Sequence, residues 1–187
     1  NSTKEYVEKY TEEFYLVDLY YRRTLEAYHK LITKENPIEQ TLSVAKRQLD
    51  LDYAKITNIL NLEWLTCVAE KGAWFTETGL KRQEDFYKNE SDTSMKQVVI
   101  VCDALRYEVA KELMQELAKE KHIATISAYQ AMLPTETKYC KPALLPHHSL
   151  RLNGTDLMVD GSLLTTTELR TAHLNKYREG AICTRYE

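Results

Sequence analysis

The chain has 187 residues, of which 43% are hydrophobic and 28% are charged, and its formal net charge is −3. This composition is typical of a soluble protein with one sizeable domain, or a domain plus an appendage. The charge excludes the overall basic surface that marks an obligate nucleic-acid binder. No apolar run reaches the roughly 20 residues needed to span a bilayer, so we expect no membrane segment.

The cysteine pattern predicts reduced thiols. The cysteines are far apart and form no Cys-x-x-Cys pair, whereas structural zinc sites pair their ligands at short spacing. We therefore expect a cytoplasmic protein with free thiols at Cys67, Cys102, Cys140 and Cys183. The chain does not begin with Met, which indicates a piece of a longer protein.

The N-terminal half of the chain predicts an all-helical segment. Apolar side chains recur at steps of three and four over residues 1–34 without Gly or Pro, which predicts one long helix. Asn36–Pro37 ends it, and a second helix is predicted over 38–63, with a further turn or helix over 61–69. The tyrosines on this spacing are typical of core packing or of a face docked on another domain. A face that stacks bases or binds a cofactor is the alternative.

A short helix is predicted over 83–88 and a polar linker over 91–96. The β-branched run Val98–Val101 then predicts a buried strand, and an apolar stripe repeating from Leu105 predicts a helix after it. Asp103 would therefore lie at the carboxyl end of a core strand, the edge where open α/β sheets bind ligands and ions. An N-cap of the following helix is the alternative role for this carboxylate.

A hydroxyl-rich loop follows the second predicted strand, residues 123–128. The loop Leu133–Thr137 precedes an apolar segment over 142–146, and this order places Thr135 and Thr137 near a helix N-terminus. Both can serve as caps. Alternatively, because a helix N-terminus favours negative charge, a hydroxyl there can attack or cradle a phosphoryl group.

The remaining residues predict a continuing strand and helix pattern. His147 and His148 are adjacent and would diverge in a strand, so we expect loop histidines rather than metal ligands. A third strand is predicted over 157–159, ending in a turn at Asp160. A helix over 165–176 and a strand over 181–186 follow, and a pattern that stops within a strand again indicates truncation.

The order and spacing of motifs from residue 97 onward closely resemble the PglZ family. The string Asp-Ala-Leu-Arg-Tyr-Glu together with the loop Leu-Pro-Thr-x-Thr is specific, and neither piece alone would be. The helical part resembles the segment before that domain in the type A PglZ proteins of the BREX bacteriophage-resistance systems. The resemblance is carried by Gln83–Tyr87, Val99–Ala110, Leu133–Thr137, Ala143–His147, Val159–Gly161 and Arg170.

PglZ domains are members of the alkaline phosphatase superfamily. The resemblance therefore implies a parallel-sheet α/β core with a metal centre, usually two zinc ions, at the carboxyl ends of the strands. It implies that Asp103 binds a metal and that Thr137 is the nucleophile, bound to metal when deprotonated, with Thr135 as the fallback. Arg106 would bind a substrate phosphate oxygen or hold a carboxylate such as Glu108. An exposed helix residue is the alternative for this arginine.

The sequence departs from the family pattern in three ways. Cys102 stands where a Ser is expected, and Cys140–Pro142 replaces a Gly-containing stretch, so we expect the helix to start or kink near Pro142. The superfamily's other Asp and His ligands are expected beyond Glu187. One carboxylate and one hydroxyl fall short of the three or four ligands that zinc needs.

We therefore expect a helical segment over 1–90, a linker over 91–96 and the N-terminal part of a PglZ α/β domain over 97–187. The expected function is a metal-dependent phosphohydrolase in bacterial phage defence. It would act on a phosphoester such as nucleic acid and work with other components of the defence complex. The chain alone is expected to be inactive. The alternative is a non-catalytic assembly module whose tyrosine-rich helices dock on those components.

Overall fold

The computed structural model describes residues 2–31, 38–71, 78–92 and 94–185. The chain divides into two compact units. The helical unit comprises Asn1–Gly79 and Ala104–Ala128, and the mixed unit comprises Leu80–Asp103 and Tyr129–Glu187. The domain boundaries expected from the sequence stay a prediction, and each unit is described by itself below.

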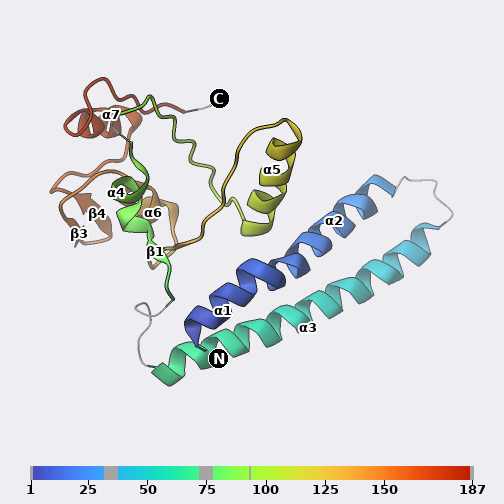
Figure 1. Ribbon diagram of the computed structural model, residues 1–187. Helices are drawn as coiled ribbons and strands as arrows, with labels where there is room; N and C mark the ends of the chain where they lie inside the picture. Colours follow the sequence, from blue (N-terminus) through green and yellow to red (C-terminus); the bar gives the residue numbers. More distant parts are fainter. Residues whose placement is uncertain (1, 32–37, 72–77, 93, 186–187) are drawn as a thin grey trace. The chain divides into compact units, whose positions relative to one another are not determined.

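A helical hairpin forms most of the helical unit (Figure 1). Its first arm is α1 (Thr3–Lys9), a π-helical turn η1 (Tyr10–Phe14) and α2 (Tyr15–Leu31), which together confirm the first predicted helix. The second arm, α3 (Glu39–Lys71), confirms the second helix and extends it through the segment expected to be a separate turn. The predicted break at Asn36–Pro37 lies outside the described residues.

Local capping and aromatic packing explain the hairpin. Ser2 and Glu5 form a reciprocal capping box that begins α1. The Tyr6 hydroxyl donates to the Leu60 carbonyl at 2.5 Å. The Tyr21 ring stacks on the Tyr53 ring of α3, with 3.7 Å between the centroids. These tyrosines therefore pack between the arms, and the buried apolar residues in the described part of this unit are Tyr6, Leu19, Cys67 and Val68.

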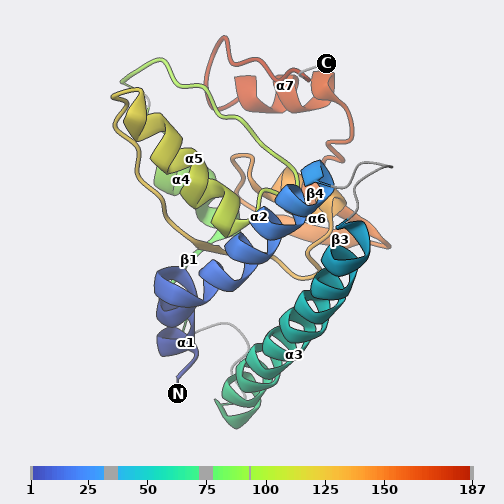
Figure 2. The ribbon, with the colours of Figure 1, turned by 90° about the vertical axis from the view of Figure 1, so that its right-hand side faces the viewer.

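The third long helix of this unit, α5 (Tyr107–Lys119), lies beside α2 in both ribbon views (Figures 1 and 2). The helix confirms the prediction made from periodicity, but the predicted apolar stripe is only partly buried, with Val109, Ala110, Met114 and Leu117 half-buried. Leu105 and Leu113 are 48% and 50% exposed, whereas Glu108 is fully buried. The physical reason is that α5 meets α2 through charged side chains, described with the site below.

The mixed unit has short elements around a small core. Parallel strands β1 (Lys81–Arg82) and β2 (Tyr129–Gln130) pair, as do antiparallel β3 (Leu150–Asn153) and β4 (Asp156–Val159). Its apolar core includes Ala143, Leu157, Val159 and Leu164, and His173 is buried with them. The helices of this unit are η2 (Gln83–Asp85), α4 (Phe86–Glu90), α6 (Thr137–Ala143) and α7 (Thr167–Asn175).

The chain is thus an α/β mixture with long helices and two small sheets, and two strand predictions are wrong. Residues 98–101 form no strand and are 49% to 83% exposed. Residues 123–128 form none either. A β-branched run becomes a buried strand only when neighbouring strands accept its hydrogen bonds, and neither run has a strand partner among the described residues.

Other predictions had mixed outcomes. The strand at 157–159, the short helix at 83–88 and the helix at 165–176 are confirmed in β4, η2–α4 and α7. The described part of 181–186 is not a strand.

In the part of the chain that the structure describes, none of the helices combines the length and apolar character that crossing a bilayer requires.

Candidate functional site

Asp103 and Thr137 meet in the mixed unit. The Thr137 Oγ1 hydroxyl donates a hydrogen bond to Asp103 Oδ2 at 3.0 Å, across 34 residues of sequence. Both side chains belong to exposed residues. The structure therefore brings together the two residues that the sequence motifs single out.

Neither residue has the capping role that was the alternative. The N-cap of α5 is Arg106, so Asp103 does not cap that helix. The N-cap of α6 is Glu136, and Thr137 is the first residue of the helix. Because the Thr137 hydroxyl donates to Asp103, it is available at the surface as a positioned oxygen rather than as a cap.

The backbone on both sides of this pair is locally constrained. Ala104, directly after Asp103, has φ of 57°, a left-handed conformation that costs an alanine about 1 kcal/mol and that clusters at functional sites. On the other side, α6 begins at Thr137 and contains Pro142 near its end. The expected helix start near Pro142 is thus wrong, because Glu136 already accepts the first backbone bonds of α6, whereas the alternative of a kink at Pro142 stays a prediction.

Gln83 joins the threonine loop to α6, a contact that the sequence analysis missed. Its Oε1 accepts from the Met132 backbone N–H at 3.1 Å, and its Nε2 donates to the Cys140 carbonyl at 3.3 Å. The side chain therefore ties the start of the threonine loop to α6, which carries Thr137. Gln83 lies in the family-like Gln-Glu-Asp-Phe-Tyr string, but periodicity gives no signal for such a bridge.

The thiol of Cys140 lies close to this pair, and its surroundings favour the protonated form. Burial raises the pKa of Cys140, the Asp103 carboxylate raises it further, and Gln83 partly opposes the shift. A thiol with a raised pKa is protonated at neutral pH and is unreactive.

Comparison of the chain with known proteins shows which family it belongs to. Residues 84–187, more than half of the chain, match the family described as the BREX system PglZ alkaline phosphatase-like domain. The chain belongs to the PglZ family.

Two curated relatives agree with this membership. The chain is 27% identical over 186 residues to the alkaline phosphatase-like protein PglZ of Bacillus cereus, covering 95% of the chain and 21% of that protein. It is 34% identical over 114 residues to the alkaline phosphatase-like protein BrxZ of Escherichia coli, covering 56% of the chain and 13% of that protein. The chain therefore spans 21% and 13% of the lengths of these two relatives. No solved structure matches it.

Arg106, the third predicted site residue, forms ion pairs in the helical unit. Its guanidinium lies 3.1 Å from Asp18 Oδ1 and 3.2 Å from Glu108 Oε1, and its side chain is 53% exposed. This confirms the interpretation that the arginine holds Glu108. Binding of a substrate phosphate stays a prediction.

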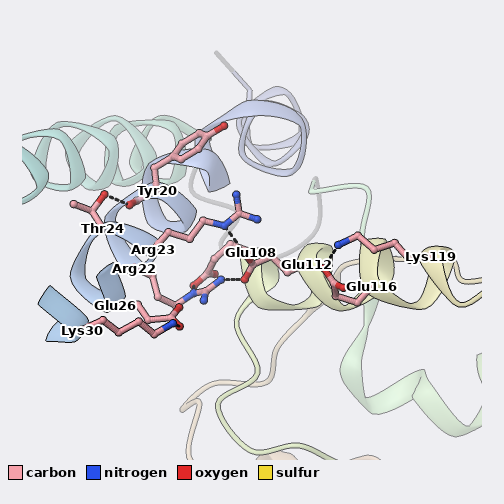
Figure 3. Close-up of polar contacts among 10 residues, drawn as sticks. All are labelled: Tyr20, Arg22, Arg23, Thr24, Glu26, Lys30, Glu108, Glu112, Glu116 and Lys119. Atoms are coloured by element: carbon pink, nitrogen blue, oxygen red, sulfur yellow. Dashed lines mark hydrogen bonds and ion pairs between the residues drawn. The ribbon is translucent and has the colours of Figure 1, made fainter. Parts of the chain in front are cut away.

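Glu108 is the centre of a charged contact between α2 and α5 (Figure 3). Its side chain is fully buried, and Arg22 Nε lies 3.8 Å from its Oε1. One turn further along α5, Glu112 pairs with both Arg22 and Arg23 of α2. The Arg-Tyr-Glu part of the family motif thus docks α5 on the hairpin.

The described residues do not complete a metal site. No group of three or more His, Cys, Asp or Glu side chains among them could hold a metal ion. Asp103 and Thr137 supply two oxygens, whereas zinc in proteins takes three or four protein ligands.

The Asp160 turn prediction is confirmed, because its carboxylate accepts from the backbone N–H groups of His148 and Ser149 and from the Tyr177 hydroxyl.

Proposed function

We propose that this chain is part of a phosphohydrolase that acts on phosphodiesters in BREX phage defence, with Thr137 as the nucleophile. The observation that carries the proposal is the hydrogen bond from the Thr137 hydroxyl to the Asp103 carboxylate, 3.0 Å long. Membership of an alkaline phosphatase-like family supports the reaction class. Because the curated relatives are several times longer than the chain, the activity of the whole protein is part of this proposal.

The pair has the arrangement of an activated nucleophile. A threonine hydroxyl is a weak nucleophile at neutral pH, and a base within hydrogen-bond reach removes that obstacle. As Thr137 Oγ1 forms its bond to phosphorus, the hydroxyl proton passes to Asp103, and the bond from phosphorus to the leaving oxygen breaks. Water then attacks the phosphothreonine phosphorus and loses a proton to solvent, the bond from phosphorus to Thr137 Oγ1 breaks, and the threonine oxygen takes back the proton from Asp103.

The metal is a separate part of the proposal. In the superfamily a divalent cation, zinc in our proposal, lowers the pKa of bound oxygens. Asp103 and Thr137 fall short of its ligand number, so we propose that further ligands come from parts of the parent protein outside this chain. The isolated chain then binds zinc weakly and turns over little substrate. Stoichiometric zinc retained by the chain through gel filtration would contradict this.

The decisive experiment is hydrolysis of bis(4-nitrophenyl) phosphate by the full-length parent protein with zinc or manganese added. Thr137→Ala is expected to abolish turnover, and Thr135→Ala, which removes the neighbouring exposed hydroxyl, is the matched control. Phosphothreonine trapped at position 137 by rapid acid quench and mass spectrometry would support the covalent step. Turnover that persists in Thr137→Ala and falls in Thr135→Ala would reassign the nucleophile.

A second candidate function is assembly, and exposed aliphatic side chains on α3 favour it. Tyr6, Tyr21 and Tyr53 pack between the hairpin arms, so these tyrosines do not form an exposed docking face. A docking face of α3 would instead be aliphatic and would bind another BREX component. Its exposed members are Val44, Leu51, Ile56, Ile59, Leu62 and Leu65. Leu51→Glu with Leu62→Glu is expected to abolish co-purification of such a component, while the exposed charge swap Lys55→Glu leaves it intact.

A further inference from the structure

A cavity of about 340 Å³ lies between the two arms of the hairpin. This volume falls in the range of roughly 300–1,000 Å³ that is typical of small-molecule sites. Five of its lining side chains are aromatic, and they come from α1, η1 and α3: Tyr6, Tyr10, Phe14, Tyr53 and Trp64. Tyr6 already packs on Phe14 and Trp64, and Tyr53 stacks on Tyr21. An aromatic ring has two faces, and a planar ligand can stack on the second face.

The charge in the cavity wall is already neutralised. Asp18 lines the cavity, but its carboxylate accepts hydrogen bonds from Tyr10 at 3.0 Å and Tyr53 at 2.7 Å. Arg106 lies 3.1 Å from the same carboxylate. A cationic ligand would therefore find no free negative charge, and the described lining residues include no Lys or Arg that would hold an anion.

The tyrosine hydroxyls add no charge. Burial, followed by the nearby Asp18 carboxylate, raises the pKa of Tyr10. Burial and the hydrogen bond to Asp18 likewise raise the pKa of Tyr53. Both phenols are neutral at physiological pH, so the cavity suits a neutral, planar molecule.

One polar group in the wall is free to read the edge of such a molecule. The Asn61 side chain lines the cavity and forms no hydrogen bond among the described residues, and Asn61 is exposed. A carboxamide can pair in a bidentate way with the N6 and N7 atoms of adenine. The π-helical turn that carries Tyr10 and Phe14 is itself a feature often found at functional sites.

We propose that this cavity binds an adenine base, stacked on its aromatic rings and read at its edge by Asn61. The proposal is independent of the phosphohydrolase function, because every lining residue lies in the helical unit. Since no cation lines the cavity, the site recognises the base and not a phosphate. Adenosine and ATP should therefore bind with similar affinity.

The test is calorimetric titration of adenosine and of ATP into the full-length parent protein. Asn61→Leu is expected to weaken adenosine binding about tenfold or more, the equivalent of one bidentate contact. The matched control is Asn58→Leu, because Asn58 is also an exposed asparagine of α3 and does not line the cavity. Melting temperatures of both variants verify that they fold.

A second measurement locates the ligand. Photolysis of 8-azidoadenosine on the parent protein should label peptides that contain Tyr10 or Trp64, and excess adenosine should suppress the label. Equal adenosine affinity in the two asparagine variants would overturn the proposal, as would labelling confined to other peptides. Saturable binding of the apolar probe toluene without binding of adenosine would also overturn it, because the cavity would then be an apolar docking hollow.

Discussion

Thr137 Oγ1 donates to Asp103 Oδ2 at 3.0 Å, and this contact joins the two motifs by which the chain resembles its family. A carboxylate at this distance can hold the hydroxyl proton and accept it during attack. The same contact also fixes the direction of the threonine oxygen. A substitution that keeps the hydrogen bond to Thr137 but removes the negative charge of Asp103 can therefore separate these two roles.

The first prediction concerns the charge of Asp103. Asp103→Asn keeps an oxygen that can accept the Thr137 hydrogen bond but cannot take up its proton. We expect kcat of the parent protein for the chromogenic diester to fall by about 10²–10⁴, the usual contribution of a general base. The measurement is steady-state kinetics with the metal held saturating.

The control is Asp156→Asn, which removes another exposed carboxylate of the mixed unit at the start of β4. Its kcat should equal that of the wild type. An Asp103→Asn enzyme with wild-type kcat would show that the carboxylate is not the proton acceptor.

The second prediction concerns the buried charge of Glu108. Glu108→Ala leaves a cavity and removes a carboxylate that lies within 3.8 Å of Arg22 and 3.2 Å of Arg106. Both arginines keep a second carboxylate, so we expect the lower end of the usual cost, a loss of about 3 kcal/mol in the free energy of unfolding. Urea denaturation followed by helical circular dichroism measures it.

Glu116→Ala is the matched control on the same helix. Glu116 pairs with Lys119 at 2.6 Å, but both side chains are more than 60% exposed, so the pair is worth about 0–1 kcal/mol. Equal denaturation midpoints for the two variants would contradict a buried ionic contact between α2 and α5.

The third prediction concerns acid stability. Hydrogen bonds from Tyr177 and from the backbone N–H groups of His148 and Ser149 hold the pKa of Asp160 well below its ordinary value of 3.8. A depressed folded-state pKa contributes stability above pH 3.8, and that stability is lost as the pH falls below it. The melting temperature of the wild type should therefore fall more steeply in acid than that of Asp160→Asn.

Asn is the suitable replacement because Asp160 has φ of 48°, a conformation that Asn tolerates. Melting curves at several pH values from neutral to below 3.8 give the difference between the two proteins. A difference that does not change with pH would show that Asp160 contributes no linked proton.

The helices were largely predictable from the sequence, and the strands were not. Helical periodicity is a local property, so the two hairpin arms and α5 follow from residue spacing. The run Val98–Val101 needs partner strands that spacing cannot reveal, and in the described chain it is exposed. Burial of Glu108 was also unpredictable, because it depends on Arg22, which is far away in sequence.

The candidate site was predicted in part for the same reason. Asp103 and Thr137 were found through motif resemblance, and their contact depends on how the loop and α6 fold together. The Gln83 bridge was missed because it joins backbone groups and leaves no side-chain pattern. Arg106 was correctly associated with Glu108, whereas its contact with Asp18 had no signal in the sequence.

The last prediction tests whether Gln83 positions the nucleophile. Gln83→Ala removes the two bonds that join Met132 to the Cys140 carbonyl, and we expect a stability loss of about 1–3 kcal/mol. Because α6 carries Thr137, kcat of the parent protein should also fall, by roughly 10-fold to 100-fold, as misplaced reacting groups lose rate. KM should change little, since Gln83 touches no substrate in this proposal.

Gln97→Ala separates positioning from stability. Gln97 forms the same kind of bridge in the same unit, accepting from the Asp92 N–H at 3.2 Å and donating to the Glu90 carbonyl at 2.6 Å. Its bonds are exposed whereas those of Gln83 are part-buried, so Gln97→Ala should cost no more stability than Gln83→Ala. It should leave kcat unchanged, because among the described residues no hydrogen bond joins Gln97 to the threonine loop or to α6. If both variants lose kcat in proportion to their lost stability, Gln83 is a structural residue, and the geometry of Thr137 is fixed by other contacts.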